Sequence, residues 1–149
     1  MKAALWLFGA ELNITIDEKD TDGNYDLITG NFPPGLEIPL HMHSKYSETI
    51  MVLEGEQTIF TLGNTTVLQA GDHFFIPVGT PHAIVNSGST FSKALTIASP
   101  SGFAKQIRLV GVEGKAEGVP SDIPNDMALF MQISAETGDT LMGPPGTRP

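Results

Sequence analysis

Two stretches of this chain, HMHSKYSE at residues 41–48 and PVGTPHAIVN at residues 77–86, contain three of its four histidines. His41 and His43 are two residues apart in a predicted strand, so their side chains point to the same face. Glu48 lies five residues beyond His43, which leaves room for a turn at Ser44–Ser47 that returns a carboxylate to the same interior. His82 begins a later strand. If the shared face is the interior, the four side chains converge on one point.

Three neutral nitrogens and one anionic oxygen suit one divalent transition metal ion better than Ca²⁺ or Mg²⁺. The sequence therefore predicts that Fe, Mn, Ni, Co, Cu or Zn binds to His41, His43, Glu48 and His82, and these ligands leave its identity open. The alternative is that the histidines are structural or exposed, and that Glu48 is a solvated charge. We favour the metal site because the same-face spacing and the carboxylate agree.

Short β-rich runs separated by turn residues fill the first hundred residues, as expected of an all-β sandwich or barrel. Pro33-Pro34-Gly35 and Pro77-Val78-Gly79 mark turns, and Gly63-Asn64 is a two-residue hairpin signal. The predicted strands are Ala3–Phe8, Leu12–Ile16, Tyr25–Phe32, Glu37–His43, Thr49–Glu54, Gln57–Leu62, Thr65–Leu68, His73–Ile76, His82–Asn86 and Ser92–Ala98.

The pattern changes after Pro100. Ser101 is a candidate cap for a short helix in which Phe103, Ile107 and Val110 share a face. Residues 125–137 show helical spacing and end before Gly138, a typical residue after a helix. The helix there could cover the barrel mouth or a partner subunit, or pack on the outer wall. Residues 143–149, rich in Pro and Gly, form a tail. We expect residues 1–100 to form the β-barrel and residues 101–149 a helical extension with its tail, packed on the same domain.

The chain has 149 residues, with 8 Lys and Arg against 17 Asp and Glu and a formal net charge of −9. This balance argues against nucleic acid and against an anionic membrane surface as partners. There is no cysteine, so disulfides, zinc-cysteine sites and thiol nucleophiles are excluded. A cytoplasmic location is the default expectation. We interpret the apolar run Ala3–Ala10 after Lys2 as a first strand, because it is short for a signal peptide and Phe8 stands where cleavage needs a small residue.

Three other features have simpler explanations than function. His73 lies beside Asp72 at a strand start, and we expect it on the surface. Residues 20–26 resemble a calcium loop, but Tyr25 stands where the loop needs Gly, so we expect an acidic surface turn. Phe and Met residues such as Phe32 and Met51 are expected to pack in the core, and we assign none of them to substrate binding.

The two stretches also match the two sequence motifs of the cupin superfamily. The first, G-x5-H-x-H-x4-E-x6-G, is present as Gly35, His41, His43, Glu48 and Gly55, and the second, G-x5-P-x-G-x2-H-x3-N, as Gly71, Pro77, Gly79, His82 and Asn86. The chain more specifically resembles the single-domain, quercetin-dioxygenase-like cupins through the residues Asp20-Thr21-Asp22-Gly23, Ser99-Pro100-Ser101-Gly102-Phe103 and Gly143-Pro144-Pro145. The resemblance implies a small antiparallel jelly-roll barrel, a metal held by His41, His43, Glu48 and His82, and glycines that shape turns.

Four protein ligands on a six-coordinate ion leave up to two open positions, and one carboxylate on a divalent ion leaves a net charge of about +1. Together with the resemblance, this favours a dioxygenase that acts on a small enolisable or phenolic substrate, with Glu48 as a candidate base. The alternatives are a redox-neutral metal-dependent isomerase or lyase, a non-catalytic small-molecule-binding cupin, and a storage-type or structural cupin. Such cupins usually pair as homodimers, and an exposed sheet edge at the N-terminus would favour pairing.

Overall fold

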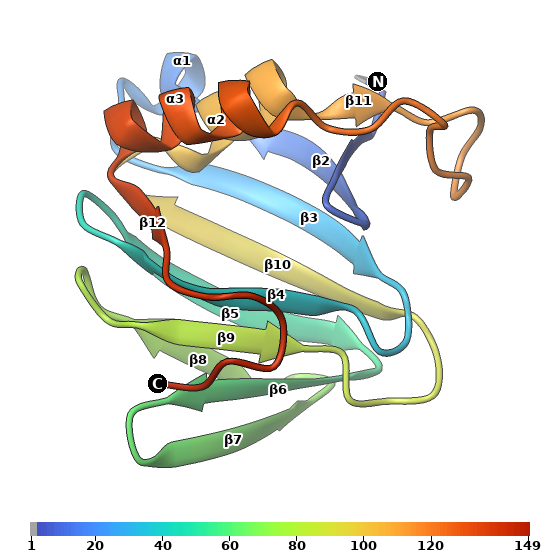
Figure 1. Cartoon of the computed structure of the whole chain (residues 1–149), viewed down its shortest axis with the longest axis vertical. Helices are drawn as coiled ribbons and strands as arrows, with labels where there is room; N and C mark the ends of the chain where they lie inside the picture. The colour runs from blue at the N-terminus through green and yellow to red at the C-terminus, as the bar shows by residue number, and fades with distance from the viewer. Residues whose placement is uncertain (1–2) are drawn as a thin grey trace.

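The computed structural model describes residues 3–149 as two antiparallel sheets that face each other, with two helices stacked beside them (Figure 1). The seven-stranded sheet contains β1 (Leu5–Leu7), β2 (Ala10–Ile16), β3 (Asp26–Phe32), β5 (Ser47–Glu54), β8 (His73–Ile76), β10 (Ser92–Ser99) and β11 (Val112–Glu113), in the order β11-β1-β2-β3-β10-β5-β8. The five-stranded sheet contains β4 (Glu37–His43), β6 (Glu56–Thr61), β7 (Asn64–Gln69), β9 (His82–Val85) and β12 (Asp139–Leu141), in the order β12-β4-β9-β6-β7. The helices are α1 (Glu18–Thr21), α2 (Phe103–Val110) and α3 (Met127–Thr137).

The all-β jelly-roll prediction is confirmed, with one refinement: the two sheets stay separate instead of closing into a continuous barrel. Each predicted strand is present, with boundaries within two residues of those expected. The strands β11 and β12 and the one-turn helix α1 were not predicted. The hairpin between β6 and β7 pairs Thr61 with Asn64, so its two-residue loop is Leu62-Gly63, one residue earlier than expected.

The core has two parts, one between the two sheets and one between the seven-stranded sheet and the helices. Ile50 and Val52 on the seven-stranded sheet pack against Ile59 and Ile84 on the five-stranded sheet. At the other end of the seven-stranded sheet, α2 and α3 replace the second sheet: Leu7, Leu12 and Ile28 pack against Ala104, Ile107, Val110 and Ile133. Burying one such aliphatic side chain contributes about 1.5–3 kcal/mol. The helical part therefore shares a core with the first three strands.

The N-terminus of α2 is capped from the sheet and not by Ser101, which corrects the expectation for this helix. Its N-cap residue is Gly102, which has no side chain to accept a hydrogen bond. The Asp26 carboxylate instead accepts hydrogen bonds from the backbone N–H of Gly102 and of Ala104, both at 2.9 Å. Asp26 is fully buried, so the interpretation of residues 20–26 as a surface turn is wrong for this last residue. His73 is exposed, as expected.

Two expectations about the ends of the chain also change. The expected N-terminal sheet edge is covered, because β11 pairs with β1; Lys2 lies outside the described residues. The tail is tied across the five-stranded sheet (Figure 1): Gly146 N–H and the Arg148 guanidinium both donate to Glu37 Oε1, and Arg148 lies 4.1 Å from the centre of the Phe60 ring. Within residues 3–149, the helices are all too short or too polar to cross a membrane.

Candidate metal centre

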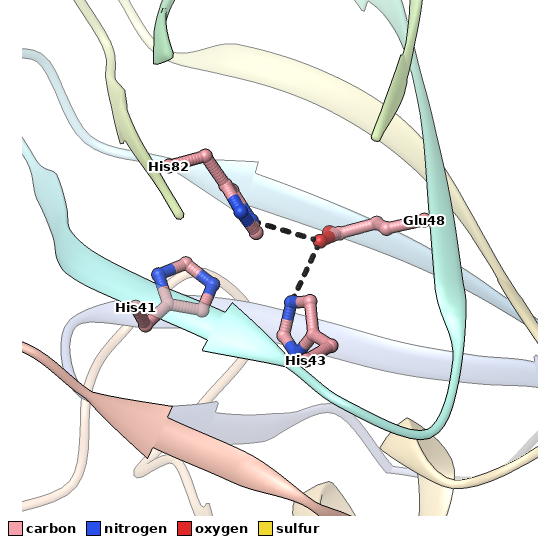
Figure 2. Close-up of side chains that lie close together, drawn as sticks. All are labelled: His41, His43, Glu48 and His82. Carbon is pink, nitrogen blue, oxygen red and sulfur yellow. Dashed lines mark hydrogen bonds and ion pairs between the residues drawn. The ribbon is translucent and has the colours of Figure 1, made fainter. Parts of the chain in front are cut away.

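The two strands that carry the histidines lie side by side in the five-stranded sheet. β4 pairs with β9 so that His41 is opposite His82, and His43 lies two residues further along β4 on the same face. Glu48 reaches the same point from β5, in the opposite sheet. The four candidate ligand atoms all lie within 4.8 Å of one another (Figure 2). The structure therefore brings together the four residues that the sequence singled out.

Each imidazole is held through its Nδ1 atom, which fixes the orientation of the ring. His41 Nδ1 lies 2.7 Å from the Pro39 carbonyl oxygen, and His82 Nδ1 lies 2.8 Å from the Thr80 carbonyl oxygen. A carbonyl oxygen only accepts hydrogen bonds, so in both rings Nδ1 is the donor, and the neutral ring offers the lone pair of Nε2. These lone pairs are the ones a metal ion needs.

The polar atoms at the centre of the cluster fit a cation. Glu48 Oε2 lies 3.0 Å from His43 Nε2 and 3.3 Å from His82 Nε2 (Figure 2). His82 is fully buried, and within the described residues its Nε2 has this 3.3 Å contact with Glu48 but no hydrogen-bond partner. A buried polar atom without a partner is costly, and coordination of an ion would satisfy it. The donor set is therefore suited to a divalent transition metal ion, whose identity these ligands do not fix.

The charges around the cluster are strongly coupled. Burial, together with the neighbouring His82 and His43, lowers the pKa of His41 to about 3. Burial also opposes protonation of His43, but its hydrogen bonds to Asp139 and Glu48 outweigh this and raise its pKa to about 9. Burial raises the pKa of Glu48, yet contacts with His43 and His82 hold it well below its usual range. Without an ion, His43 is therefore protonated on both ring nitrogens at neutral pH and lies between two carboxylates.

Asp139 is a site residue that sequence reasoning missed. β12 pairs with β4 so that Asp139 is opposite His43, and its Oδ1 accepts hydrogen bonds from His43 Nδ1 at 2.5 Å and from the Tyr46 hydroxyl at 2.7 Å. Its Oδ2 accepts from Thr137 Oγ1 at 2.5 Å. Tyr46 is buried and its ring stacks on His43 with 4.4 Å between centroids. A carboxylate behind a ligand histidine fixes the ring and increases its basicity.

The second motif positions His82 through a turn bonded to the first motif. Gly79 has φ of 78°, a conformation that favours glycine, and its N–H donates to the His43 carbonyl oxygen at 2.7 Å. Asn86 is buried, and its side chain bonds to backbone groups: its amide donates to the Phe32 and Thr90 carbonyl oxygens and accepts from Gly88 N–H. Asn86 therefore fixes the loop that follows β9 and is not among the candidate ligands.

The cluster opens on a cavity of about 340 Å³ between the two sheets and the helices. Its walls are largely apolar and include Leu12, Ile28, Phe32, Ile38, Ile84 and Ala94 from the sheets, with Phe103, Met127 and Phe130 from α2 and α3. Met127 and Phe130 of α3 line the cavity, in line with the first of the three placements considered for this helix. Ile133, on the same helix, packs in the core. The volume is at the low end of the range for small-molecule sites.

Two facing antiparallel sheets with a His-His-Glu-His cluster between them define a cupin whose cluster could bind a metal ion. A family profile for the cupin domain matches residues 29–98, which places this segment of the chain in the cupin family. That segment runs from β3 to β10 and includes all four cluster residues.

Curated and solved relatives agree with this assignment. Quercetin 2,3-dioxygenase of Bacillus subtilis is 31% identical over 106 residues, which cover 70% of this chain and 31% of that protein. A predicted oxalate decarboxylase from Thermotoga maritima is 25% identical with a TM-score of 0.58, covering 61% of this chain and 80% of the other. The polyketide cyclase RemF from Streptomyces resistomycificus is 26% identical with a TM-score of 0.55, covering 62% of this chain and 66% of the other. The chain spans about a third of the length of the curated relatives it matches.

Proposed function

We propose that the protein is a metal-dependent dioxygenase acting on a small enolisable or phenolic molecule, with His41, His43, Glu48 and His82 as the ligands of one divalent ion. The observation that carries the proposal is a cluster of three imidazoles and a carboxylate, of which His41, His43 and Glu48 line an apolar cavity. The similarity to a quercetin 2,3-dioxygenase supports the reaction class. A divalent ion there would supply positive charge that favours an enolate or phenolate and a centre able to react with dioxygen.

The residues of the chain supply binding, orientation and a place for the proton. The apolar walls exclude water and favour a flat, largely apolar substrate over a sugar or a phosphate ester. Pro39, Thr80 and Asp139 fix the three rings, so the nitrogens need no rearrangement during the reaction. Glu48 is the group that we assign to accept the substrate proton. Contacts with His43 and His82 lower its pKa, so it is a weak base that holds the proton only briefly.

The test is oxygen consumption by the Fe, Mn, Ni and Co forms with a panel of flavonols and β-diketones. Turnover in ¹⁸O₂ should place both labelled atoms in the products without an added reductant. The variant His41→Ala should lose metal and activity, whereas His73→Ala, which removes the exposed histidine outside the cluster, should keep both. Background oxygen uptake in every metal form would rule out the dioxygenase.

A redox-neutral reaction is the second candidate, and the likeness to a polyketide cyclase favours it. The same cluster can stabilise an enolate without dioxygen, with Glu48 moving a proton between two positions of the substrate. Turnover of a diketone or polyketide analogue under argon, at the same rate as in air, would select this function. Tight binding with no turnover in either atmosphere would instead indicate a ligand-binding protein.

A homodimer is part of the proposal, and the outer face of the seven-stranded sheet is its candidate interface. Met51, Leu53 and Phe75 are exposed on β5 and β8, with 37%, 40% and 56% of their surfaces accessible. They are neighbours, because Thr49 pairs with Phe75 and Met51 with His73. Burial of this apolar face by a second copy would be favourable. Light scattering should show a dimer that Phe75→Lys with Met51→Lys converts to a monomer; an unchanged mass would remove this interface.

A further inference from the structure

One polar side chain in the cavity donates no hydrogen bond to the residues that the structure describes. Gln57 on β6 is 1% exposed and lines the same cavity as the metal cluster. Its amide nitrogen is buried and has no hydrogen-bond partner within residues 3–149. Its inward-facing neighbours Ile59, Leu68 and Ile84 are aliphatic core residues, so an apolar side chain would suit this position better. An amide held there at a cost to stability indicates a ligand.

The strand register places Gln57 far from the cluster along the cavity. Ile59 on β6 pairs with Ile84 on β9, and the strands are antiparallel. Gln57 lies two residues before Ile59 and His82 two residues before Ile84, so the two positions are four residues apart along the sheet. At about 3.3 Å per residue, the separation is roughly 13 Å. The side chains between them on this face are apolar.

We propose that Gln57 hydrogen-bonds the end of the substrate that is remote from the metal cluster. The site would then select a molecule with three parts: an acidic oxygen at the cluster, an apolar ring system in the middle, and a hydroxyl or carbonyl group at the opposite end. The molecule spans the roughly 13 Å between the two strand positions less the reach of the side chains at each end. This inference rests on the proposed function, because the cluster must hold the first end. Gln57 is thus assigned as a specificity-determining residue.

Gln106 provides an internal comparison. It also lines the cavity and is buried, but its Nε2 donates to Ser134 Oγ at 2.8 Å, which ties α2 to α3. Replacing Gln106 leaves the Ser134 hydroxyl without this partner, whereas replacing Gln57 removes only an unsatisfied group. The two glutamines therefore distinguish an amide that serves the fold from one that is available to a ligand.

The first experiment compares thermal unfolding of Gln57→Met and Gln106→Met, two substitutions of similar size. Gln57→Met should melt at the same temperature as the unmodified protein or higher, and Gln106→Met about 3–6 °C lower. A fall for Gln57→Met as large as that for Gln106→Met would show that the Gln57 amide serves the fold, and would overturn the proposal.

The second experiment measures binding of 3-hydroxyflavone and of derivatives with one added hydroxyl on either ring, using the Zn²⁺-loaded protein to prevent turnover. One derivative should bind the unmodified protein about three- to tenfold more tightly than the parent, and Gln57→Met should lose that preference while binding the parent equally well. Identical preferences in both proteins would overturn the assignment. If neither protein binds any flavonol, the proposed substrate class is wrong, and the melting temperatures still decide the role of Gln57.

Discussion

Replacing Asp139 with Asn tests whether the carboxylate behind His43 sets metal affinity. Asp139 accepts hydrogen bonds from His43, Tyr46 and Thr137. An Asn side chain has the same shape, and its amide oxygen can still accept from His43 and Tyr46. The substitution therefore keeps the ring in place and removes the negative charge that strengthens its bond to a cation.

The expected loss in metal affinity is about 10–100-fold, the usual effect of removing such a partner. Protons compete with the metal, because the pKa of His43 is about 9 in the metal-free protein. At pH 7 this competition weakens binding by a factor of about 100, and at pH 9 by only about 2. Asp139→Asn also lowers the pKa of His43, so it relieves the competition. The loss should be clear at pH 9 and smaller at pH 7.

Competition with a fluorescent Zn²⁺ chelator at the two pH values measures both effects. Asp72→Asn is the control, because it removes one exposed carboxylate, bonded to Gln69 N–H, and changes the net charge equally. Equal affinities of Asp139→Asn and the unmodified protein at pH 9 would refute the argument. So would a loss of the same size at both pH values, since it would show that His43 binds no extra proton.

Three further predictions concern the parts of the fold around the site: the start of α2, the turn before His82 and the C-terminal tail. Asp26→Ala should lower the free energy of unfolding by about 1–2 kcal/mol in a denaturant titration, because it leaves the start of α2 uncapped, and Asp26→Asn should lose less. Gly79→Ala should destabilise the protein by about 1–2 kcal/mol through backbone strain alone, since an added Cβ meets no atom within 4 Å. Burial raises the pKa of Glu37, but bonds from Gly146 and Arg148 outweigh this and lower it below 4.5. The tail contact is therefore complete above pH 4.5 and lost as the pH falls through the lowered value, which the amide shift of Gly146 should report in the unmodified protein and not in Glu37→Gln.

Local patterns were enough to predict the strands β1 to β10 and the four cluster residues. His41 and His43 alternate along one strand, and the turn residues that bring Glu48 and His82 to them are visible in the sequence. Side chains alternate between the two faces of a strand, so residues two apart share a face whatever the fold is. The same holds for the helices, whose spacing and terminal glycine are local features.

Pairing between distant segments could not be predicted. Asp139 lies 96 residues from His43, and nothing local indicates that the residues after Gly138 form a strand beside β4. Asp26 caps a helix whose N-cap residue lies 76 residues later, and it was interpreted from its acidic neighbours alone. Gln57 stood in a predicted strand with no sign of which face it occupied. Each of these roles depends on register between elements, which the sequence pattern leaves open.

The cluster depends on the spacing between the sheets as well as on its own residues. Three of the candidate ligands come from β4 and β9 in one sheet, and Glu48 comes from β5 in the other. Ile50 lies two residues after Glu48, and Ile84 lies two residues after His82. Both belong to the apolar cluster that packs between the sheets. The same apolar contacts that hold the sheets together therefore set the distance between carboxylate and imidazoles. Because packed interiors transmit small displacements, core substitutions that leave all four side chains in place can still change metal affinity.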